Sequence, residues 1–278
     1  MTVDGHQHFW VYKPEDLPWI PPELPLLRRD YLPEHLAPLL QANGVDGTIV
    51  VQAQHSLRET QWLLELAERH PFIRGVVGWV DLRSPRLRGE LERFSKSRKL
   101  KGLRHILQDE ADLNFMLGRG FTAGIGLLKE FGLTYDLVIA PRHLPAACEL
   151  VARFPEQPFV LDHIAKPLIK DGVLSPWDAD LRKLASFPNV FCKVSGLVTE
   201  ADWAKWQPAD FTPYLDVVWE AFGARRIMFG SDWPVCLLAG DYAKVRGLAA
   251  GYVGSLSKSE QQAFWGGVAS RFYSLEDK

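Results

Sequence analysis

The chain has 278 residues, a formal net charge of −2, 47% hydrophobic residues and 24% charged residues. This composition is typical of a globular protein with a large buried core, and it excludes an extended disordered chain. Lys and Arg never form a run longer than a pair, which argues against nucleic acid as a partner because nucleic-acid binding requires a concentrated basic face. We therefore expect a small-molecule partner, and nothing in the sequence indicates the oligomeric state.

The amino terminus and the cysteines indicate the cellular compartment. The first residues, MTVDGHQHFW, lack the basic and apolar regions of a secretory signal, and no apolar stretch approaches the ~20 residues that span a bilayer. Cys148, Cys192 and Cys236 are an odd number of cysteines without CxxC spacing, so neither a disulfide framework nor a zinc knuckle is indicated. We expect a cytoplasmic protein with reduced thiols and no membrane contact.

Apolar, β-branched runs bounded by turn residues alternate along the chain with helix-like segments. Helices are expected at 33–43, 57–69, 144–153 and 213–222, with a terminal helix at 258–272. Pro33 suits the first turn of a helix, and Gly44 suits the residue that follows one. Eight strands are expected at about 2–8, 45–53, 73–81, 100–107, 134–140, 158–164, 190–196 and 227–232.

This alternation predicts an α/β fold with a parallel sheet, in which crossover helices bury both faces. We predict a single domain over residues 1–278, a (β/α)8 TIM barrel, because eight strand–helix units fill the chain up to about residue 234. An open, doubly wound sheet would give the same local pattern.

Polar residues that can perform chemistry recur where the predicted strands end. In a TIM barrel these carboxyl ends and the loops after them form the active-site face. The segments are His6-Gln7-His8, Gln52-Ala53-Gln54, Arg104-His105, Asp162-His163, Lys193-Val194-Ser195 and Gly230-Ser231-Asp232.

Four of these residues are the candidate catalytic or metal-binding groups. His6 and His8 are two apart on a strand, so both rings point to the same face and can converge on one ion or one substrate atom. His163 lies in VLDHIAKP, and Asp232 in FGSDWP, where small residues indicate crowded backbone around a carboxylate. Each has a structural alternative: a histidine bonded to the backbone, or an aspartate that forms a turn or caps a helix.

The HxH at 6–8, LDHxxKP at 161–167, KVSG at 193–196 and GSDWP at 230–234 resemble the amidohydrolase superfamily, and most closely its sugar-lactonase branch, the fuconolactonase-like proteins. The motifs span nearly the whole chain. The resemblance implies a distorted TIM barrel that hydrolyses the lactone of a sugar acid, such as L-fuconolactone, with Asp232 activating water.

The chemistry of the residues agrees with this implication. Lactone opening requires a base for water, positive charge at the carbonyl oxygen and a proton for the leaving alkoxide. Asp232 can take the proton of water and return it to the leaving oxygen. The carbonyl can be polarised by a divalent ion on the histidines, or by His163 with a cation such as Arg104 or Lys193.

The metal is where the chain departs from the superfamily pattern. Binuclear members use a lysine at the end of strand four, but Lys101 lies at the other end of that strand, and Asp136 stands where mononuclear members use a strand-five histidine. One divalent ion, zinc by its ligand preference, is expected on some or all of His6, His8, His163 and Asp232. A metal-free site, in which His6 and His8 orient Asp232, is the equal alternative.

Further residues are expected to contact the substrate, although each has an alternative role in packing or in a salt bridge. A long, proline-rich loop at 9–30 is expected to cover the site and to supply one of them. The predicted contacts are Arg104, His105, Lys193, Gln54, Trp79 and Trp19.

Two other functions remain open from the sequence. One is a hydrolase of carboxylated lactones of the muconolactone or pyrone type, or a metal-dependent decarboxylase; Arg28 and Arg29 in the loop would then bind an anionic substrate. The other is a sugar-acid binding protein without catalysis, which would not need a base together with several converging histidines.

Overall fold

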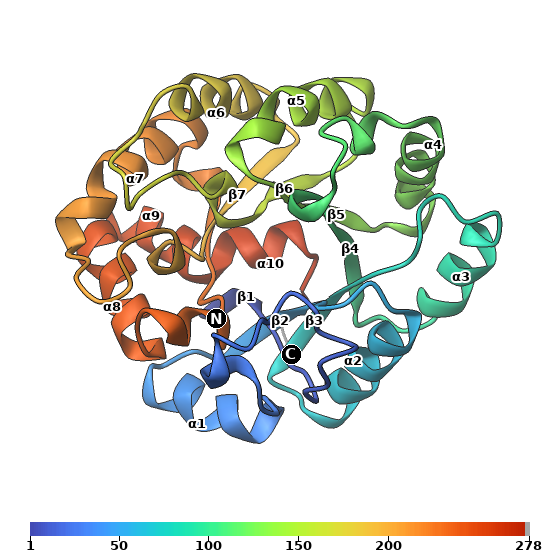
Figure 1. The fold of residues 1–278 in the computed structure, drawn as a ribbon, viewed down its shortest axis with the longest axis horizontal. Helices are drawn as coiled ribbons and strands as arrows, with labels where there is room; N and C mark the ends of the chain where they lie inside the picture. Colours follow the sequence, from blue (N-terminus) through green and yellow to red (C-terminus); the bar gives the residue numbers. More distant parts are fainter. Residues whose placement is uncertain (276–278) are drawn as a thin grey trace.

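The computed structural model describes residues 1–275, and its eight parallel strands follow one another in chain order. Helices surround the strands (Figure 1). The predicted (β/α)8 barrel is confirmed, because an open doubly wound sheet would not pair its strands consecutively. The strands are β1 Val3–Gln7, β2 Gly47–Val51, β3 Ile73–Gly78, β4 Leu100–Ile106, β5 Thr134–Val138, β6 Phe159–Leu161, β7 Val190–Val194 and β8 Ile227–Phe229.

The outer helices agree closely with the sequence-based expectations. The ranges 33–43, 57–69 and 144–153 each match an observed helix to within one residue, and Gly44 adopts the left-handed φ of 63° expected after a helix. The helices are α1 Pro33–Ala42, α2 Leu57–Arg69, α3 Leu87–Phe94, α4 Arg119–Leu128, α5 Leu144–Arg153, α6 Trp177–Ala185, α7 Pro208–Phe222, α8 Tyr242–Val253, α9 Lys258–Gln262 and α10 Val268–Phe272.

Helix α7 begins five residues before the predicted start at 213. Pro208 occupies its first position, and the Asp210 carboxylate accepts a hydrogen bond from the Gln207 amide at 2.8 Å, which caps the helix. Pro213 lies inside the helix. A proline there removes one backbone hydrogen bond, and the helix continues past it.

The barrel closes beyond the end of β8. The Asp232 amide donates to the His6 carbonyl oxygen at 2.8 Å, and the His8 amide donates to the Trp233 carbonyl oxygen at 2.7 Å. The short β6 and β8 strands and the register shifts between β1 and β4 account for the predicted distortion of the barrel. The hydrogen bonds that close the barrel therefore also bring Asp232 beside His6 and His8.

Two apolar layers stabilise the barrel. The larger lies between the strands and the outer helices, and the smaller joins strand residues such as Val160 and Met228 to Phe272 and Tyr273 at the carboxyl end of the chain. Figure 1 shows α10 across the middle of the ring of strands. Among residues 1–275, no helix has the length and apolar character needed to cross a bilayer.

Arg226 forms hydrogen bonds to several segments at the end of the barrel opposite the carboxyl ends of the strands. Its guanidinium Nη1 donates to the carbonyl oxygens of Ala185, Phe187 and Val190 at 2.8, 3.0 and 3.1 Å, and Nε donates to Phe222.

We expect Arg226→Ala to lower the free energy of unfolding by about 2–4 kcal/mol, because several carbonyl oxygens lose a charged donor. Urea denaturation measures the change. Arg226→Lys, which keeps the charge but loses the planar fork of donors, is the matched control and should recover part of the loss. An Ala variant as stable as the wild type would contradict this role.

Candidate active site

A small cavity of about 220 Å³ opens among the loops that follow the strands. This is the face on which TIM barrels build their active sites. Three of the four predicted catalytic residues line it, and the fourth, His6, lies fully buried against all three of them. The lining residues are His8, Trp19, Ala53, Arg104, Ile106, Gln108, Asp109, Val138, His163, Lys166, Asp232 and Val235.

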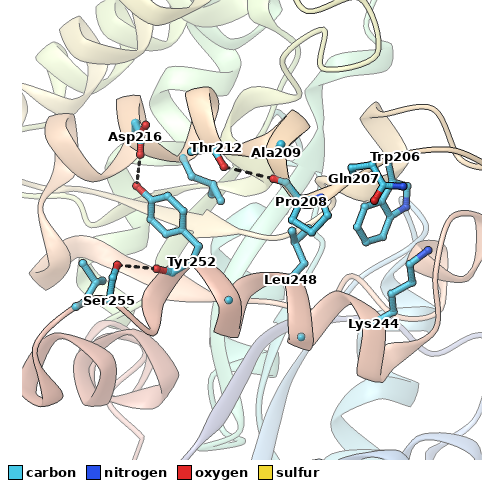
Figure 2. A pocket seen from close by; sticks show the side chains of 14 residues that line it. Trp206, Gln207, Pro208, Ala209, Thr212, Asp216, Lys244, Leu248, Tyr252 and Ser255 are labelled. Atoms are coloured by element: carbon cyan, nitrogen blue, oxygen red, sulfur yellow. Dashed lines mark hydrogen bonds between the residues drawn. The ribbon is translucent and has the colours of Figure 1, made fainter.

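A larger groove, of about 860 Å³, lies between α7 and α8 on the outside of the barrel (Figure 2). Its charged groups are paired with neighbours: the Tyr252 hydroxyl donates to Asp216 at 2.7 Å, and the Lys244 ammonium lies 4.1 Å from the centre of the Trp206 ring. The strand ends do not reach this groove, so we place the candidate site in the smaller cavity.

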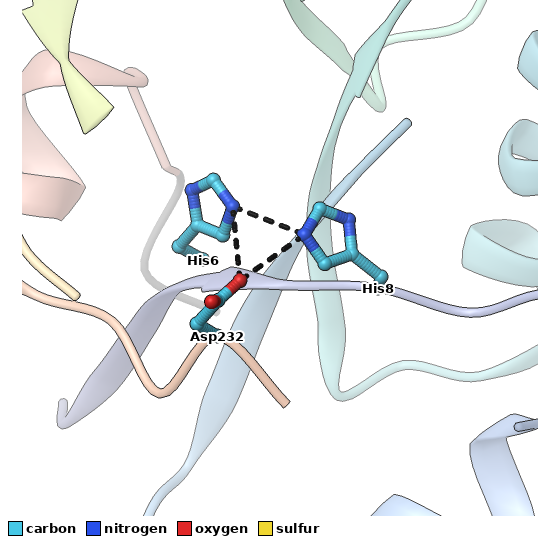
Figure 3. A group of neighbouring side chains, drawn as sticks. All are labelled: His6, His8 and Asp232. Atoms are coloured by element: carbon cyan, nitrogen blue, oxygen red, sulfur yellow. Dashed lines mark hydrogen bonds and ion pairs between the residues drawn. The ribbon is translucent and has the colours of Figure 1, made fainter. Parts of the chain in front are cut away.

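His6, His8 and Asp232 face one another across the closure of the barrel (Figure 3). The Nε2 atoms of His6 and His8 are 3.2 Å apart, and Asp232 Oδ1 lies 3.3 Å from His8 Nε2 and 3.8 Å from His6 Nε2. A tetrahedral zinc ion with ligands at about 2.0–2.2 Å separates its ligand atoms by roughly 3.4 Å. The spacing of these three atoms therefore fits one ion.

The hydrogen bonding of His8 leaves its Nε2 lone pair available at this group. Its Nδ1 lies 2.8 Å from the Val51 carbonyl oxygen, which can only accept, so Nδ1 carries the hydrogen. In a neutral ring, Nε2 then presents a lone pair to the Asp232 carboxylate. Two acceptors at this distance require a cation between them or a second proton on His8, which are the metal-bound and metal-free alternatives expected from the sequence.

A second group that could hold a metal, His6, Asp162 and His163, already contains a cation. The Lys193 ammonium lies 3.0 Å from Asp162 Oδ1 and 3.2 Å from His6 Nδ1. A metal ion there would be repelled by this charge, so the geometry favours the group formed by His6, His8 and Asp232.

His163 begins a strained left-handed turn. His163, Ile164, Ala165 and Lys166 have φ values of 54°, 47°, 61° and 51°, a conformation that costs roughly 1–2 kcal/mol for each L-residue. The Lys166 amide donates to the His163 carbonyl oxygen at 2.8 Å, and Trp177 Nε1 donates to that of Ile164 at 2.8 Å. These bonds and the burial of Ile164 and Ala165 hold the turn in place.

The strained turn brings the His163 ring to the cavity, where it is neutral at neutral pH. Burial is the largest cause that lowers the pKa of His163, to about 4. Its Nδ1 lies 2.8 Å from Ser195 Oγ. Gly196 permits this position: it has a φ of 63°, and a Cβ there would lie 2.6 Å from His163 Nδ1.

Asp232 is ionised at neutral pH although it is buried. Burial alone would raise its pKa, but interactions with His163 and His8 outweigh burial and hold the pKa below its ordinary value. The crowding predicted from FGSDWP is present, since a Cβ on Gly230 would lie 2.7 Å from the Cβ of His6. Asp4, which the sequence did not single out, accepts hydrogen bonds from the His6 and Ser231 amides at 3.2 and 2.9 Å.

Arg104 lines the cavity, but its N–H groups are directed to protein acceptors. Nε and Nη2 donate to Gln52 Oε1 at 3.1 and 2.9 Å, and Nη2 also donates to the Gln52 carbonyl oxygen. Nη1 donates to Asp162 Oδ2 at 3.0 Å and lies 3.4 Å from His6 Nε2. Four of the five N–H groups thus have acceptors on Gln52 and Asp162, and Arg104 supports the site more than it offers donors to a ligand.

Lys193, predicted as a substrate contact, is fully buried beneath His6. Its ammonium pairs with Asp136 and Asp162, and the Tyr273 hydroxyl donates to the same Asp136 carboxylate at 2.9 Å. The lysine therefore contacts His6 from the interior of the barrel and does not line the cavity.

Three other predicted contacts also lie outside the cavity. Successive side chains of a strand point to opposite faces, so His105 points outward where Arg104 points inward, and its ring stacks on Phe115. Trp79 Nε1 donates to His105 Nδ1 at 3.2 Å, and Gln54 lines a separate surface pocket.

Trp19 does line the cavity, as the loop at 9–30 predicted. Its Nε1 donates to the Ala53 carbonyl oxygen at 3.0 Å. Sequence reasoning missed Gln108, Asp109 and Lys166, which also line it. All three lie in loops after predicted strands, and Lys166 belongs to the LDHxxKP motif, so position relative to the strand ends could have found them.

We expect Lys193→Met to lower the free energy of unfolding by about 3–5 kcal/mol, because two buried carboxylates lose their ammonium partner. Urea denaturation measures this. The matched control is the double variant Lys193→Met, Asp136→Asn, which should lose less than the sum of its two single variants. Losses that simply add would contradict a coupled buried pair.

Comparisons with known proteins identify the family of the chain. The family model described as Amidohydrolase matches residues 3–275. The chain is 43% identical to the L-fucono-1,5-lactonase of Burkholderia multivorans, over 100% of this chain and 97% of that one, and 39% identical to the L-fucono-1,5-lactonase of Burkholderia ambifaria, over 86% and 82%.

A solved structure supports the same assignment. The crystal structure of an amidohydrolase from Burkholderia multivorans with bound zinc is 44% identical, with a TM-score of 0.94 over 99% of this chain and 100% of that one. Fold, strand-end histidines and full-length similarity coincide, and the chain belongs to the amidohydrolase family.

Proposed function

We propose that this protein is a lactonase, a hydrolase that opens the ring ester of a sugar-acid lactone such as L-fuconolactone to the aldonic acid. The observation that carries the proposal is an ionised, buried Asp232 beside a neutral His163 at the wall of a small cavity. The full-length similarity to L-fucono-1,5-lactonases supports the substrate class. At about 220 Å³ the cavity is smaller than the ~300–1,000 Å³ of drug-sized sites and suits one sugar ring.

In the first step, the Asp232 carboxylate takes a proton from water as the water oxygen bonds to the lactone carbonyl carbon. The π electron pair of the carbonyl moves onto its oxygen. The Ser195 hydroxyl can donate to His163 Nδ1, which leaves the His163 Nε2–H as a donor to this oxyanion.

In the second step, the carbonyl re-forms and the bond from carbon to the ring oxygen breaks. The ring oxygen leaves with the electron pair and takes the proton from Asp232, so the base is regenerated. Water and lactone thus yield one aldonic acid, which ionises and releases a proton at neutral pH.

We propose that His6, His8 and Asp232 hold one divalent ion, which we infer to be zinc. When bound, the ion supplies positive charge that lowers the pKa of a neighbouring water. We leave His163 out of the ligand set because its Nε2 lies 4.0 Å from Asp232 Oδ1, farther than the roughly 3.4 Å between ligand atoms of a tetrahedral zinc ion. In the metal-free alternative, a protonated His8 would orient Asp232.

The contacts of the arginines give no support to a carboxylated lactone or a decarboxylase substrate. Arg104 has its donors engaged within the barrel. The loop arginines do not line the cavity either: Arg28 Nε donates to the Tyr12 hydroxyl, and the Arg29 guanidinium lies 4.8 Å from the centre of the Tyr31 ring.

We expect proton release, followed with a pH indicator, on a panel of aldono-1,4- and 1,5-lactones including L-fuconolactone. Asp232→Asn should lower kcat by at least ~10³-fold, since the amide cannot accept the proton, while affinity for the product acid stays within about tenfold. Asp171→Asn, an exposed aspartate in the loop after β6, is the matched control. No lactone opened above the buffer rate by the wild type would refute the proposed function.

Zinc content and thermal stability test the metal site. We expect one zinc ion per chain, a lower Tm after chelation and a recovered Tm when zinc is added. At a free zinc concentration of 100 times the Kd, binding should raise the free energy of unfolding by roughly 2.7 kcal/mol. His8→Ala should lose both the ion and the shift, and His163→Ala should keep them. An ion retained by His8→Ala would contradict the ligand set, and turnover that survives chelation would assign catalysis to the metal-free site.

A further inference from the structure

The cavity holds a basic side chain that the proposed mechanism does not use, that of Lys166. Of the residues that line the cavity within 1–275, two have basic side chains, Arg104 and Lys166. Arg104 has four of its five N–H groups engaged by Gln52 and Asp162, and its Nη1 lies 3.4 Å from His6 Nε2 beneath the cavity wall. Lys166 is therefore the lining cation that can offer donors to a ligand.

The Lys166 ammonium is held by one weak contact. Among the described residues, its partner is Glu200, whose Oε1 lies 3.3 Å from Lys166 Nζ, and the lysine side chain is 27% exposed. An ammonium has three hydrogens, so this pairing leaves donors for the cavity. Glu200 comes from the loop after β7, so the lysine is anchored from the rim of the site.

The backbone directs Lys166 and His163 to the same cavity. They stand at the two ends of the left-handed turn, and the bond from the Lys166 amide to the His163 carbonyl oxygen closes it. Four strained residues persist only where the surrounding structure holds them, and such strain gathers at functional sites.

We propose that Lys166 is a catalytic residue, which donates a hydrogen bond to the lactone carbonyl oxygen and stabilises the oxyanion beside the His163 Nε2–H. This inference rests on the proposed lactonase function. The lysine keeps its proton throughout: its hydrogen bond strengthens as the π electron pair moves onto oxygen, and weakens when the carbonyl re-forms. The left-handed turn from His163 to Lys166 is then the oxyanion hole of the enzyme.

An alternative role for Lys166 is to bind a sugar hydroxyl, and kinetics separate the two roles. A donor that acts only in the transition state changes kcat, whereas a donor that binds substrate and transition state equally changes KM. Removal of one oxyanion donor lowers kcat by about 10²–10³-fold in other hydrolases.

The experiment compares steady-state kinetics of wild type, Lys166→Ala, Lys166→Arg and Lys170→Ala on the lactone that the wild type opens fastest. We expect Lys166→Ala to lose about 10²–10³-fold in kcat with KM within about threefold, and Lys166→Arg to recover part of the loss. Added ethylammonium should restore Lys166→Ala activity in a saturable manner. Lys170→Ala, an exposed lysine in the same loop, should match the wild type.

Ethylammonium rescue distinguishes a missing charge from a disturbed fold, because an amine in solution cannot repair packing. A rise in KM at constant kcat, or a Lys166→Ala variant with wild-type kinetics, would overturn the inference and leave the lactonase proposal standing. Loss of activity without rescue, together with a lowered Tm, would assign Lys166 a structural role and also overturn it. A wild type that opens no lactone would refute the proposed function, and the inference would fall with it.

Discussion

The site depends on the seam where the barrel closes between β1 and the chain that follows β8. The two backbone hydrogen bonds of this seam join His6 to Asp232 and His8 to Trp233. Because the histidines and the carboxylate stand on the two segments that the seam joins, closing the barrel and assembling the site are the same structural event. Gly230 makes the approach possible, since any side chain there would collide with His6.

Beneath the seam, the barrel interior contains charged side chains whose burial would be unfavourable without their ion-pair partners. Lys193 and Arg104 share Asp162, and Lys193 also pairs with Asp136. Burying such groups costs free energy that their pairing only partly recovers, so the network is weak evidence for stability. Its effect on the site is positional: Lys193 and Asp162 contact one ring nitrogen of His6, and Arg104 approaches the other, which holds the ring toward Asp232 and His8.

In the proposed mechanism, the residues around the cavity have separate chemical roles. The buried, ionised Asp232 would take the proton of water, while the neutral His163 ring and the Lys166 ammonium would donate to the oxygen on which charge develops. A base and an oxyanion site on separate strand ends can act on opposite sides of one carbonyl without neutralising each other. Trp19 from the loop at 9–30 adds an aromatic wall to the same cavity.

The sequence by itself determined the eight-stranded alternation, the face on which the site lies, and the grouping of His6, His8, His163 and Asp232, because periodicity and strand ends are local properties. It could not determine which strand-end side chains point inward or how deep in the barrel they lie, and so it predicted His105, which points outward, and Lys193, which lies beneath His6, as substrate contacts. Only the tertiary structure decided this, since register, the pairing of Arg104 and the left-handed turn that presents Lys166 depend on contacts between residues far apart in the chain.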